Sequence, residues 1–286
     1  MMFLSDLIPE DFNYYDYILQ NKLDYLLKIE EIPRSPEKKV SKSKTFSVDP
    51  ENLEPFPAEL DDLSRLHYIV CSRKINTILE FGVGKSSTIF ANALSINKQE
   101  NELFVKKSLR KNNLFQVHSI DNSQKWIDVC LQNIDQEYIE KGISNFHFSN
   151  LFTSEFAGRI CTFYEKLPNI SPDLIYLDGP DQFSAQEEVR GISTRNSDRF
   201  PMSGDILSFE HFLHPGTLII VDGRTANARF LKCNLQRNWS YSYSREWDQH
   251  FFELLEEPLG IYNKAMIDYC LGIKFYRRLE ALKISS

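Results

Sequence analysis

A glycine turn between an apolar segment and a helix constrains the fold of this chain more than any other feature. Residues 75–81 form a short, mostly apolar segment that runs into Gly82-Val83-Gly84, and a helix-forming segment begins at Ser86 or Ser87. A strand, a tight glycine turn and a helix, in this order, present free backbone N–H groups to a ligand. Because glycine lacks a Cβ, Gly82 and Gly84 allow a sharp turn and a close approach of the ligand. The segment therefore predicts a strand with a binding site at its carboxyl end.

Four further apolar segments follow, and a polar residue stands where each of them ends. Residues 114–120, 145–149, 173–177 and 217–221 are followed by Asp121, Asn150, Asp178 and Asp222. Helix-forming segments lie between or after them, at residues 87–96, 124–138, 152–166, 205–213 and 226–235. Strands that alternate with helices predict a mostly parallel sheet with helices on both faces. Since parallel strands end at one edge of the sheet, we expect the polar residues to gather there.

Three regions are expected along the chain. Residues 1–57 are interpreted as a helical extension followed by a proline- and lysine-rich arm, residues 58–256 as the sheet domain, and residues 257–286 as a helical tail packed on that domain. Within the domain, residues 97–113 are expected to be a polar excursion, and residues 239–247 and 251–255 an antiparallel strand pair.

A long segment at residues 181–203 contains few aliphatic residues and is expected to be irregular. Long loops in compact domains are usually functional or disordered. The segment carries Arg190, Arg195 and Arg199, which would suit a phosphate or carboxylate on a substrate if they are not simply surface arginines.

Composition limits the classes of protein and of partner. The net charge of −7 and the pI near 5.5 argue against a nucleic-acid-binding surface. No apolar stretch approaches the ~20 residues of a membrane span, and the amino terminus lacks the pattern of a signal peptide. The five cysteines include no C-x-x-C pair, which favours reduced cysteines in a cytoplasmic protein. A homo-oligomer is left open.

Three classes of ligand use a glycine turn of this kind, and two of them fit this sequence poorly. A P-loop needs a glycine where this chain has Leu79. A dinucleotide fingerprint needs glycine or alanine where this chain has Ser87, and an acid about 20 residues further on. The first acid that closes a strand, Asp121, comes much later. These features weaken the interpretation of the chain as an NAD(P)-dependent oxidoreductase of Rossmann type, which stays an alternative.

The third class fits better. The sequence Glu80-Phe81-Gly82-Val83-Gly84 resembles the first motif, acid-x-Gly-x-Gly, of the class I S-adenosylmethionine-dependent methyltransferases. The resemblance covers roughly residues 58–256. It implies a Rossmann-like, doubly wound, mostly parallel seven-stranded sheet with an antiparallel terminal strand pair, and S-adenosylmethionine as the cofactor.

The resemblance also implies roles for residues around the turn. Glu80 would face the amino group of the methionine part, and Lys85 and Ser86 would lie near its carboxylate. Asp121, with Asn122 beside it, would accept hydrogen bonds from the ribose hydroxyls, as in the second motif of the family. Asn150 stands where the family often reads the adenine amino group. Helix capping is the simpler structural role for Asp121.

Asp178 closes the fourth strand and would face the transferred methyl group. The sequence Asp178-Gly179-Pro180-Asp181 resembles the acid turn of small-molecule O-methyltransferases. In the catechol and caffeoyl-CoA branch, acids that close the fourth and fifth strands bind a divalent cation, and Asp178 and Asp222 match two of those ligands. The third ligand is an asparagine directly after the fifth-strand acid, where this chain has Gly223. A metal-independent site is therefore favoured.

The predicted function is methylation of a hydroxyl on a small-molecule or sugar-like acceptor that uses S-adenosylmethionine. Asp178 is the first candidate for the group that takes the hydroxyl proton, followed by His211, His214 and Asp222. An aminopropyltransferase is a further relative, and should show a more acidic pocket after the fourth strand. A non-catalytic protein that binds S-adenosylmethionine or serves as a scaffold is the remaining alternative.

Overall fold

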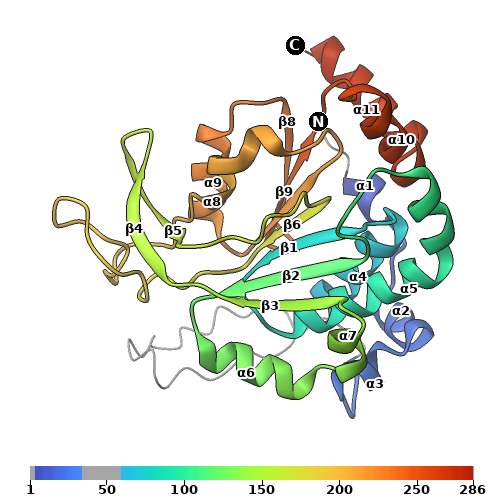
Figure 1. Ribbon diagram of the computed structural model, residues 1–286, viewed down its shortest axis with the longest axis horizontal. Coiled ribbons are helices and arrows are strands. Elements are labelled where there is room, and N and C mark those ends of the chain that lie inside the picture. The colour runs from blue at the N-terminus through green and yellow to red at the C-terminus, as the bar shows by residue number, and fades with distance from the viewer. Residues whose placement is uncertain (1–3, 34–58, 286) are drawn as a thin grey trace.

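The computed structural model describes residues 4–33 and 59–285, and the predicted proline- and lysine-rich arm lies almost entirely outside them. Within these residues the chain forms a seven-stranded sheet in the order β3-β2-β1-β6-β7-β9-β8 (Figure 1). The parallel strands are β1 (Thr77–Phe81), β2 (Gln116–Asp121), β3 (Ser144–Phe148), β6 (Leu174–Leu177) and β7 (Leu218–Asp222). β9 (Gln249–Leu254) runs antiparallel to β7, and β8 (Trp239–Ser244) lies at the edge beside β9. The predicted fold class is confirmed.

Helices cover both faces of the sheet. α4 (Leu60–Ser72) and α5 (Lys85–Ser108) contribute to the apolar core on one face, and α8 (Asp205–Phe209) and α9 (Thr225–Asn234) to the core on the other. In β1, Ile78 belongs to the first core and Leu79 to the second. Neighbouring residues of a strand point to opposite faces, so a strand covered on both faces is apolar at nearly every position.

Further helices are α1 (Leu4–Leu7), α2 (Tyr14–Asn21), α3 (Leu23–Leu27), α6 (Gln124–Asn133), α7 (Gln136–Glu140), α10 (Gly260–Cys270), α11 (Ile273–Ser285) and the 3-10 helix η2 (Glu210–Phe212).

The helix predicted near residues 152–166 is wrong. This segment is an antiparallel hairpin of β4 (Leu151–Phe156) and β5 (Arg159–Tyr164), separate from the main sheet. The turn between the strands has positive φ at both central residues, Ala157 (φ 47) and Gly158 (φ 74), which suits the right-handed twist of a hairpin. Threonine and aromatic residues are frequent in both strands and favour extended structure.

Three predicted helix boundaries also differ. The polar excursion predicted at residues 97–113 is largely helical, because α5 continues to Ser108 through good helix formers such as lysine, glutamate and glutamine. The helix predicted at residues 124–138 is divided into α6 and α7 at Asp135, whose side chain caps α7 by accepting from the Glu137 N–H. The carboxy-terminal helix is divided into α10 and α11 at Gly272, which has φ of +56°.

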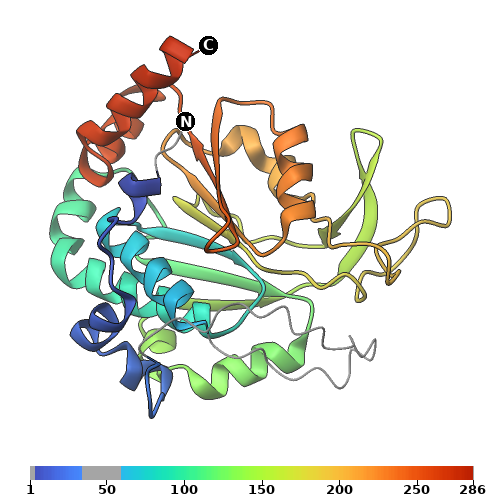
Figure 2. The same ribbon diagram turned by 180° about the vertical axis from the view of Figure 1, so that it is seen from behind.

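The hairpin and residues 181–203 form one structure, which we call the hairpin arm. Single bridges join Phe152 to Gln186 and Thr162 to Ser203, so this segment runs along both strands of the hairpin. The hairpin and the segment project from the same side of the molecule, at the left of Figure 1 and the right of Figure 2. The predicted irregular segment is therefore attached to its neighbours by backbone hydrogen bonds.

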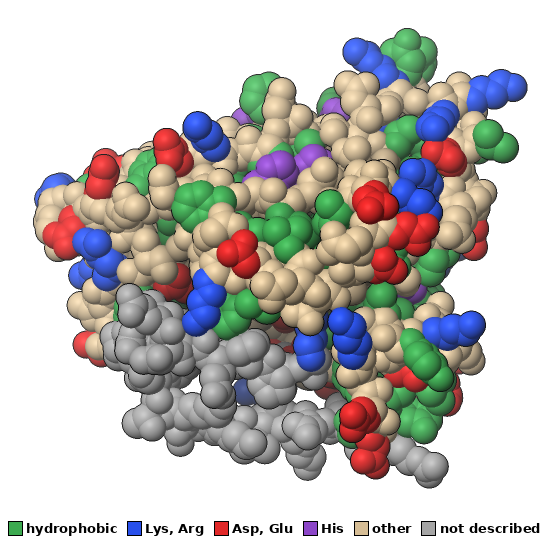
Figure 3. All heavy atoms as spheres, turned by 60° about the horizontal axis from the view of Figure 1, so that its bottom comes forward, with side chains coloured by type: hydrophobic (Ala, Val, Ile, Leu, Met, Phe, Trp, Pro, Cys, Tyr) green, Lys and Arg blue, Asp and Glu red, His purple; other side chains and the backbone are tan. Residues whose placement is uncertain are grey.

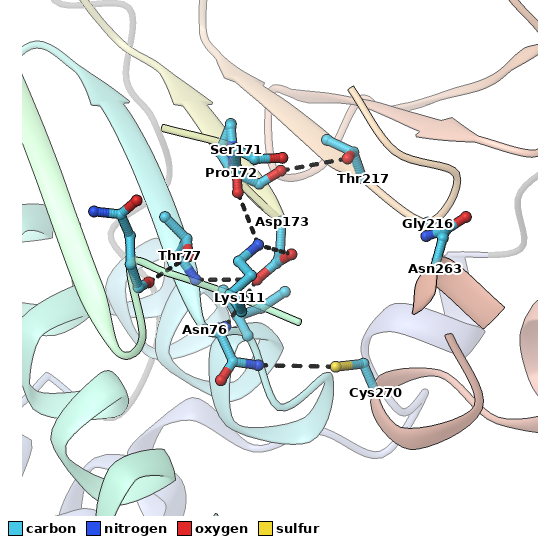
Figure 4. Close-up of polar contacts among 12 residues, drawn as sticks. Asn76, Thr77, Lys111, Ser171, Pro172, Asp173, Gly216, Thr217, Asn263 and Cys270 are labelled. Atoms are coloured by element: carbon cyan, nitrogen blue, oxygen red, sulfur yellow. Dashed lines mark hydrogen bonds and ion pairs between the residues drawn. The ribbon is translucent and has the colours of Figure 1, made fainter. Parts of the chain in front are cut away.

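The amino-terminal edge of the sheet is fastened by a polar cluster around Asp173 (Figure 4). Its Oδ2 accepts the backbone N–H groups of Asn76 (3.1 Å) and Thr77 (3.0 Å), which begin β1. Its Oδ1 lies 2.5 Å from Nζ of Lys111, which also donates to the carbonyl oxygen of Ser171 (2.7 Å). These contacts tie the start of β6 to the start of β1, at the edge opposite the predicted site.

The carboxy-terminal helix α11 is joined to the sheet by a buried ion pair. Glu253 of β9 accepts hydrogen bonds from Arg73, at the end of α4, and from Arg278 of α11.

Among the described residues, no helix has the length and apolar character needed to cross a membrane. On the described part of the face in Figure 3, acidic and basic side chains are interspersed, so the negative net charge is not gathered in one patch of that face.

Candidate active site

The predicted strand-end residues lie together at the carboxyl edge of the sheet. The amide of Gly82 donates to the carbonyl oxygen of Ile120 (2.9 Å), which places the glycine turn beside the end of β2. The amide of Asp178 donates to the carbonyl oxygen of Phe81 (3.0 Å), which places the end of β6 on its other side. Asp222 ends β7, the next strand in the sheet.

Gly82 and Gly84 serve different purposes in the turn. Gly82 has φ of +96°, and a Cβ on it would lie 3.0 Å from the amide nitrogen of Gly179. Glycine is thus needed at position 82 first of all because a side chain there would collide with the neighbouring turn at Gly179. Gly84 has an extended backbone (φ −179°), and a Cβ there would meet only Oγ of Ser86, at 3.9 Å. The space beside Gly84 is open, as a ligand that approaches the backbone requires.

Glu80 lies behind the glycine turn and not on its surface. The side chain is buried and accepts hydrogen bonds from the hydroxyls of Ser86 (2.6 Å), Ser87 (2.6 Å) and Ser119 (2.5 Å). Burial raises the pKa of Glu80 to about 7, although the three hydroxyls oppose the rise. Glu80 therefore fixes the first turn of α5 to β1 and β2, and its contact with a cofactor amino group stays a prediction.

Asp121 joins β2 to the glycine turn. The Val83 N–H donates to Oδ2 (3.2 Å) and the Ser123 N–H to Oδ1 (2.7 Å). Burial raises the pKa of Asp121 to about 6, against these hydrogen bonds. Each oxygen keeps a second lone pair, so the half-buried carboxylate retains the capacity to accept from two vicinal hydroxyls. Asn122 follows it and is also half-buried.

Other predicted cofactor residues are placed at the same edge with different surroundings. Lys85 is exposed at the first residue of α5, and Ser86 is engaged with Glu80. Asn150 is exposed after β3, and its side-chain amide donates to Glu165 at 2.9 Å. The amide that was predicted to read adenine is thus held by Glu165, the residue directly after the hairpin.

Asp178 and Asp222 are connected by residues that sequence reasoning did not assign to the site. The hydroxyl of Tyr176 donates to Oδ2 of Asp222 at 2.7 Å. Arg224 reaches back to β6, where it donates to the carbonyl oxygens of Asp178 and Pro180, and its Nε lies 3.7 Å from Oδ1 of Asp178. The side chain of Asp178 is 55% exposed. Packing around Asp178 raises its pKa, Arg224 opposes the rise, and Asp222 adds to it.

A second cation stands close to this pair. Arg65 of α4 is buried, forms ion pairs with Asp61 and Asp62, and lies over the ring of Trp247, with 4.9 Å between the guanidinium carbon and the ring centroid. Burial lowers the pKa of Arg65, and nearby carboxylates, Asp61 first and Asp222 after it, oppose the shift. The first turns of α4 therefore bring positive charge toward the end of β7.

His211 was predicted as a catalytic residue, and the structure does not bring it to the site. His211 and His214 precede β7, in which Asp222 is the fifth residue and lies about 13 Å beyond Leu218. Burial lowers the pKa of His214, and Lys111 of the amino-terminal cluster lowers it further. Both histidines thus belong to the opposite edge of the sheet.

The arginines of the hairpin arm are engaged locally. Arg195 pairs with Glu188 (3.1 Å), and Arg199 donates to the carbonyl oxygen of Ser193. Arg190 is exposed in the same segment. Two of the three guanidinium groups thus already hold the arm together, which weakens the predicted grip on an anionic substrate.

The donor set at the strand ends does not fit a divalent cation. Asp178 and Asp222 are each in contact with a hydrogen-bond donor or cation of the chain, and Gly223 supplies no side chain. Within the described residues, no group of three or more His, Cys, Asp or Glu side chains is arranged to hold a metal. Mg²⁺ and Ca²⁺ require several oxygen ligands, which two occupied carboxylates do not provide.

Comparison with models of protein families gives no match, and comparison with curated protein sequences gives none either. Among solved structures, the chain is similar to the O-methyltransferase TomG from Streptomyces achromogenes in complex with SAM, with 12% identity, a TM-score of 0.39, and coverage of 88% of this chain and 93% of that one. It is also similar to the O-methyltransferase from Bacillus cereus in complex with SAH, with 14% identity, a TM-score of 0.36, and coverage of 88% and 95%. These values are too low to assign a function, which has to come from the strand order and the residues at the strand ends.

Proposed function

We propose that this chain is an S-adenosylmethionine-dependent methyltransferase that methylates a hydroxyl of a small-molecule or sugar-like acceptor. The cofactor would lie across the carboxyl ends of β1 and β2. The open space beside Gly84 and the orphan N–H groups of the first turn of α5 support this position. The remaining lone pairs of Asp121 would accept from the ribose.

The strand order is the single observation that carries the proposal. Both an S-adenosylmethionine site and a dinucleotide site use a glycine turn followed by an acid at the end of the second strand. In the dinucleotide fold the strands follow the order 3-2-1-4-5-6. Here the last strand of the sheet, β9, is inserted antiparallel between β7 and β8. This arrangement agrees with the methyltransferase sheet that the sequence resembles, and it disfavours an NAD(P)-dependent oxidoreductase.

The chemistry asks mainly for alignment and for a proton acceptor. Bound S-adenosylmethionine supplies a methyl group on a sulfonium, whose carbon–sulfur bond breaks as the acceptor oxygen bonds to the carbon. The proton of the acceptor hydroxyl would pass to Asp178, which is exposed enough to meet a substrate. Asp178 is therefore the proposed catalytic residue, and Asp222 stands beside it.

Several expectations from the sequence stay predictions. They are a cytoplasmic location and a small-molecule partner that is not a nucleic acid, and assembly into a homo-oligomer stays open. The division at residues 57 and 256 likewise stays a proposal, supported by the contacts of Arg278 in α11 with the sheet domain. A non-catalytic protein that binds the same cofactor is the remaining competitor.

Calorimetric titration with S-adenosylhomocysteine tests the cofactor. The native protein is expected to bind in the micromolar range, of order −8 kcal/mol, and Asp121→Ala is expected to lose most of that affinity. Glu140→Ala serves as the matched control, because Glu140 is an exposed acid on α7, which leads into β3 at the opposite edge.

NAD is the control ligand. Absence of any response to S-adenosylhomocysteine from well-folded protein would remove the methyltransferase proposal, and a response to NAD would restore the oxidoreductase. Binding of S-adenosylhomocysteine without methylation of any acceptor in a panel of polyols and sugars would favour the non-catalytic protein.

A further inference from the structure

Asp178 and Asp222 stand opposite one another at the ends of neighbouring strands. The last registered pair of β6 and β7 is Leu177 with Val221, so the two acids follow as the next pair. Like charges directly opposite in a sheet repel and destabilise it. A site built this way needs something that compensates the repulsion and holds the two carboxylates at a fixed separation.

Two residues of this chain connect the acids in opposite directions. From β6, Tyr176 donates its hydroxyl to Asp222 of β7. From the turn after β7, Arg224 donates to the backbone carbonyls of Asp178 and Pro180, after β6, and its Nε approaches the Asp178 carboxylate. Each strand thus holds the end of the other, and we call this pair of contacts the brace.

The chemistry of the brace is suited to a permanent role. An arginine side chain does not lose its charge in proteins, so Arg224 compensates negative charge at any pH at which the fold exists. Burial, together with Asp222, raises the pKa of Tyr176 well above its ordinary value, so the hydroxyl stays a donor. Tyr176 is itself fixed by its burial and by edge-on packing against Phe90, with 5.4 Å between the ring centroids.

We propose that Tyr176 and Arg224 are positioning residues that set the Asp178–Asp222 pair and take the place of a divalent cation, so that the active site works without a metal. The proposal rests on the proposed function for its view of the pair as the acceptor site. The brace holds Asp222 through its Oδ2, and leaves Asp178 exposed to take the proton of the acceptor. It also accounts for Gly223: with Arg224 folded back onto β6, the residue after Asp222 has no ligand role to fill.

Titration with Mn²⁺, followed by the electron paramagnetic resonance signal of the free ion, tests the brace without any acceptor. The native protein is expected to bind Mn²⁺ with a Kd of about 1 mM or weaker. Arg224→Ala removes the competing cation and is expected to bind Mn²⁺ about tenfold more tightly, while Arg224→Lys, which keeps a positive charge, is expected to stay close to the native protein. A purely structural role for Arg224 would leave the affinity for Mn²⁺ unchanged.

Two further variants keep the test decisive. Tyr176→Phe removes one hydroxyl with little change of volume, and is expected to tighten Mn²⁺ binding in the same direction even if Arg224→Ala proves too unstable to measure. Arg195→Ala is the matched control, because it removes an arginine from the hairpin arm and leaves the strand ends intact. Thermal melting establishes that each variant is folded.

Two results would overturn the proposal that the brace takes the place of a metal. One is a micromolar, one-to-one Mn²⁺ site in the native protein that Asp222→Asn abolishes. The other is an affinity for Mn²⁺ that neither Arg224→Ala nor Tyr176→Phe changes. A native protein that fails to bind S-adenosylhomocysteine refutes the proposed function alone, since Mn²⁺ binding is measured without the cofactor.

Discussion

The backbones of Gly82 and Gly179 are in direct contact. A Cβ placed on Gly179 would lie 2.5 Å from the amide nitrogen of Gly82 and 2.7 Å from its Cα. The atoms it would meet are backbone atoms directly after β1 and at its last residue, and β1 has neighbouring strands on both sides, so this backbone cannot move aside. The ends of β1 and β6 are thus able to meet only because both turns carry glycine, and this contact sets the distance between the glycine turn and Asp178.

Gly179→Ala is expected to destabilise the protein by about 3 kcal/mol or more, because the added methyl group overlaps backbone that cannot relax. Chemical denaturation monitored by circular dichroism measures the loss. Gly158→Ala is the control, since a Cβ on Gly158 would meet nothing within 4 Å and only its positive φ (+74°) opposes alanine. It is expected to cost about 1 kcal/mol from backbone strain alone. Equal losses in the two variants would show that the contact of the two turns is not tight.

Gly84→Ala is expected to separate binding from stability. The backbone of Gly84 is extended and the space beside it is open, so the variant is expected to lose about 1 kcal/mol or less, mainly through the poorer helix cap. The methyl group would occupy the approach to the turn, and the Kd for S-adenosylhomocysteine is expected to rise about tenfold or more. Calorimetry on both proteins measures the change. Unaltered affinity would mean that the ligand does not approach the turn at Gly84.

Glu80 is expected to make stability depend on pH. Its pKa is raised from 4.5 to about 7 by burial, so the folded state binds more protons than the unfolded state between these values. The contribution of Glu80 to the free energy of unfolding is therefore fully present below pH 4.5. It is lost as pH rises toward 7, a loss of about 3 kcal/mol. Glu80→Gln removes the titration. Denaturation at pH 5 and pH 8 should therefore show that the stability of the variant, relative to that of the native protein, is greater at pH 8.

The comparison with Glu80→Gln needs a variant that controls for other titrating groups. Glu140→Gln changes an exposed acid on α7, and its stability relative to the native protein is expected to be the same at both pH values. A constant difference between Glu80→Gln and the native protein would show that the three serine hydroxyls keep the carboxylate ionised, and that burial does not dominate.

Much of the sheet could be predicted from the sequence, because its strands are buried on both faces and give short apolar segments that end at polar residues. Asp121, Asp178 and Asp222 were found in this way. The hairpin of β4 and β5 was missed because polar residues such as Ser154, Glu155 and Arg159 interrupt its apolar pattern. Besides the pairing of its own two strands, the hairpin is bridged to Gln186 and Ser203, residues far along the chain.

The site was predictable only as far as strand ends define it. His211 was misplaced although its position before β7 puts it at the amino-terminal end of that strand, whereas Asp222 lies at the carboxyl end. Tyr176 offered a signal, since it stands two residues before Asp178 and shares its face of the sheet. The partner of Arg224 was not predictable, because only the three-dimensional fold directs the guanidinium back to Asp178.

Glu253→Gln is expected to be among the most destabilising conservative changes at a distance from the site. Glu253 is buried between Arg73 (2.9 Å to Nη2) and Arg278 (2.7 Å to Nε), so its loss deprives Arg73 of its carboxylate and leaves Arg278 with the longer contact to Asp6 (3.5 Å). A cost of about 3–5 kcal/mol is expected in chemical denaturation. Glu257→Gln, which affects an exposed pair with Lys283, is the control and is expected to cost about 1 kcal/mol or less.

The same variant tests the direction of the Glu253 titration. Burial alone would raise the pKa of Glu253, but Arg73 and Arg278 outweigh burial and hold it below the ordinary value of 4.5. The stabilisation is therefore present above that value and is lost as pH falls through the lowered pKa. The gap in stability between the native protein and Glu253→Gln should narrow under acidic conditions. A gap that widens on acidification would mean that the carboxyl is protonated in the fold and that α11 is held by something other than this charge.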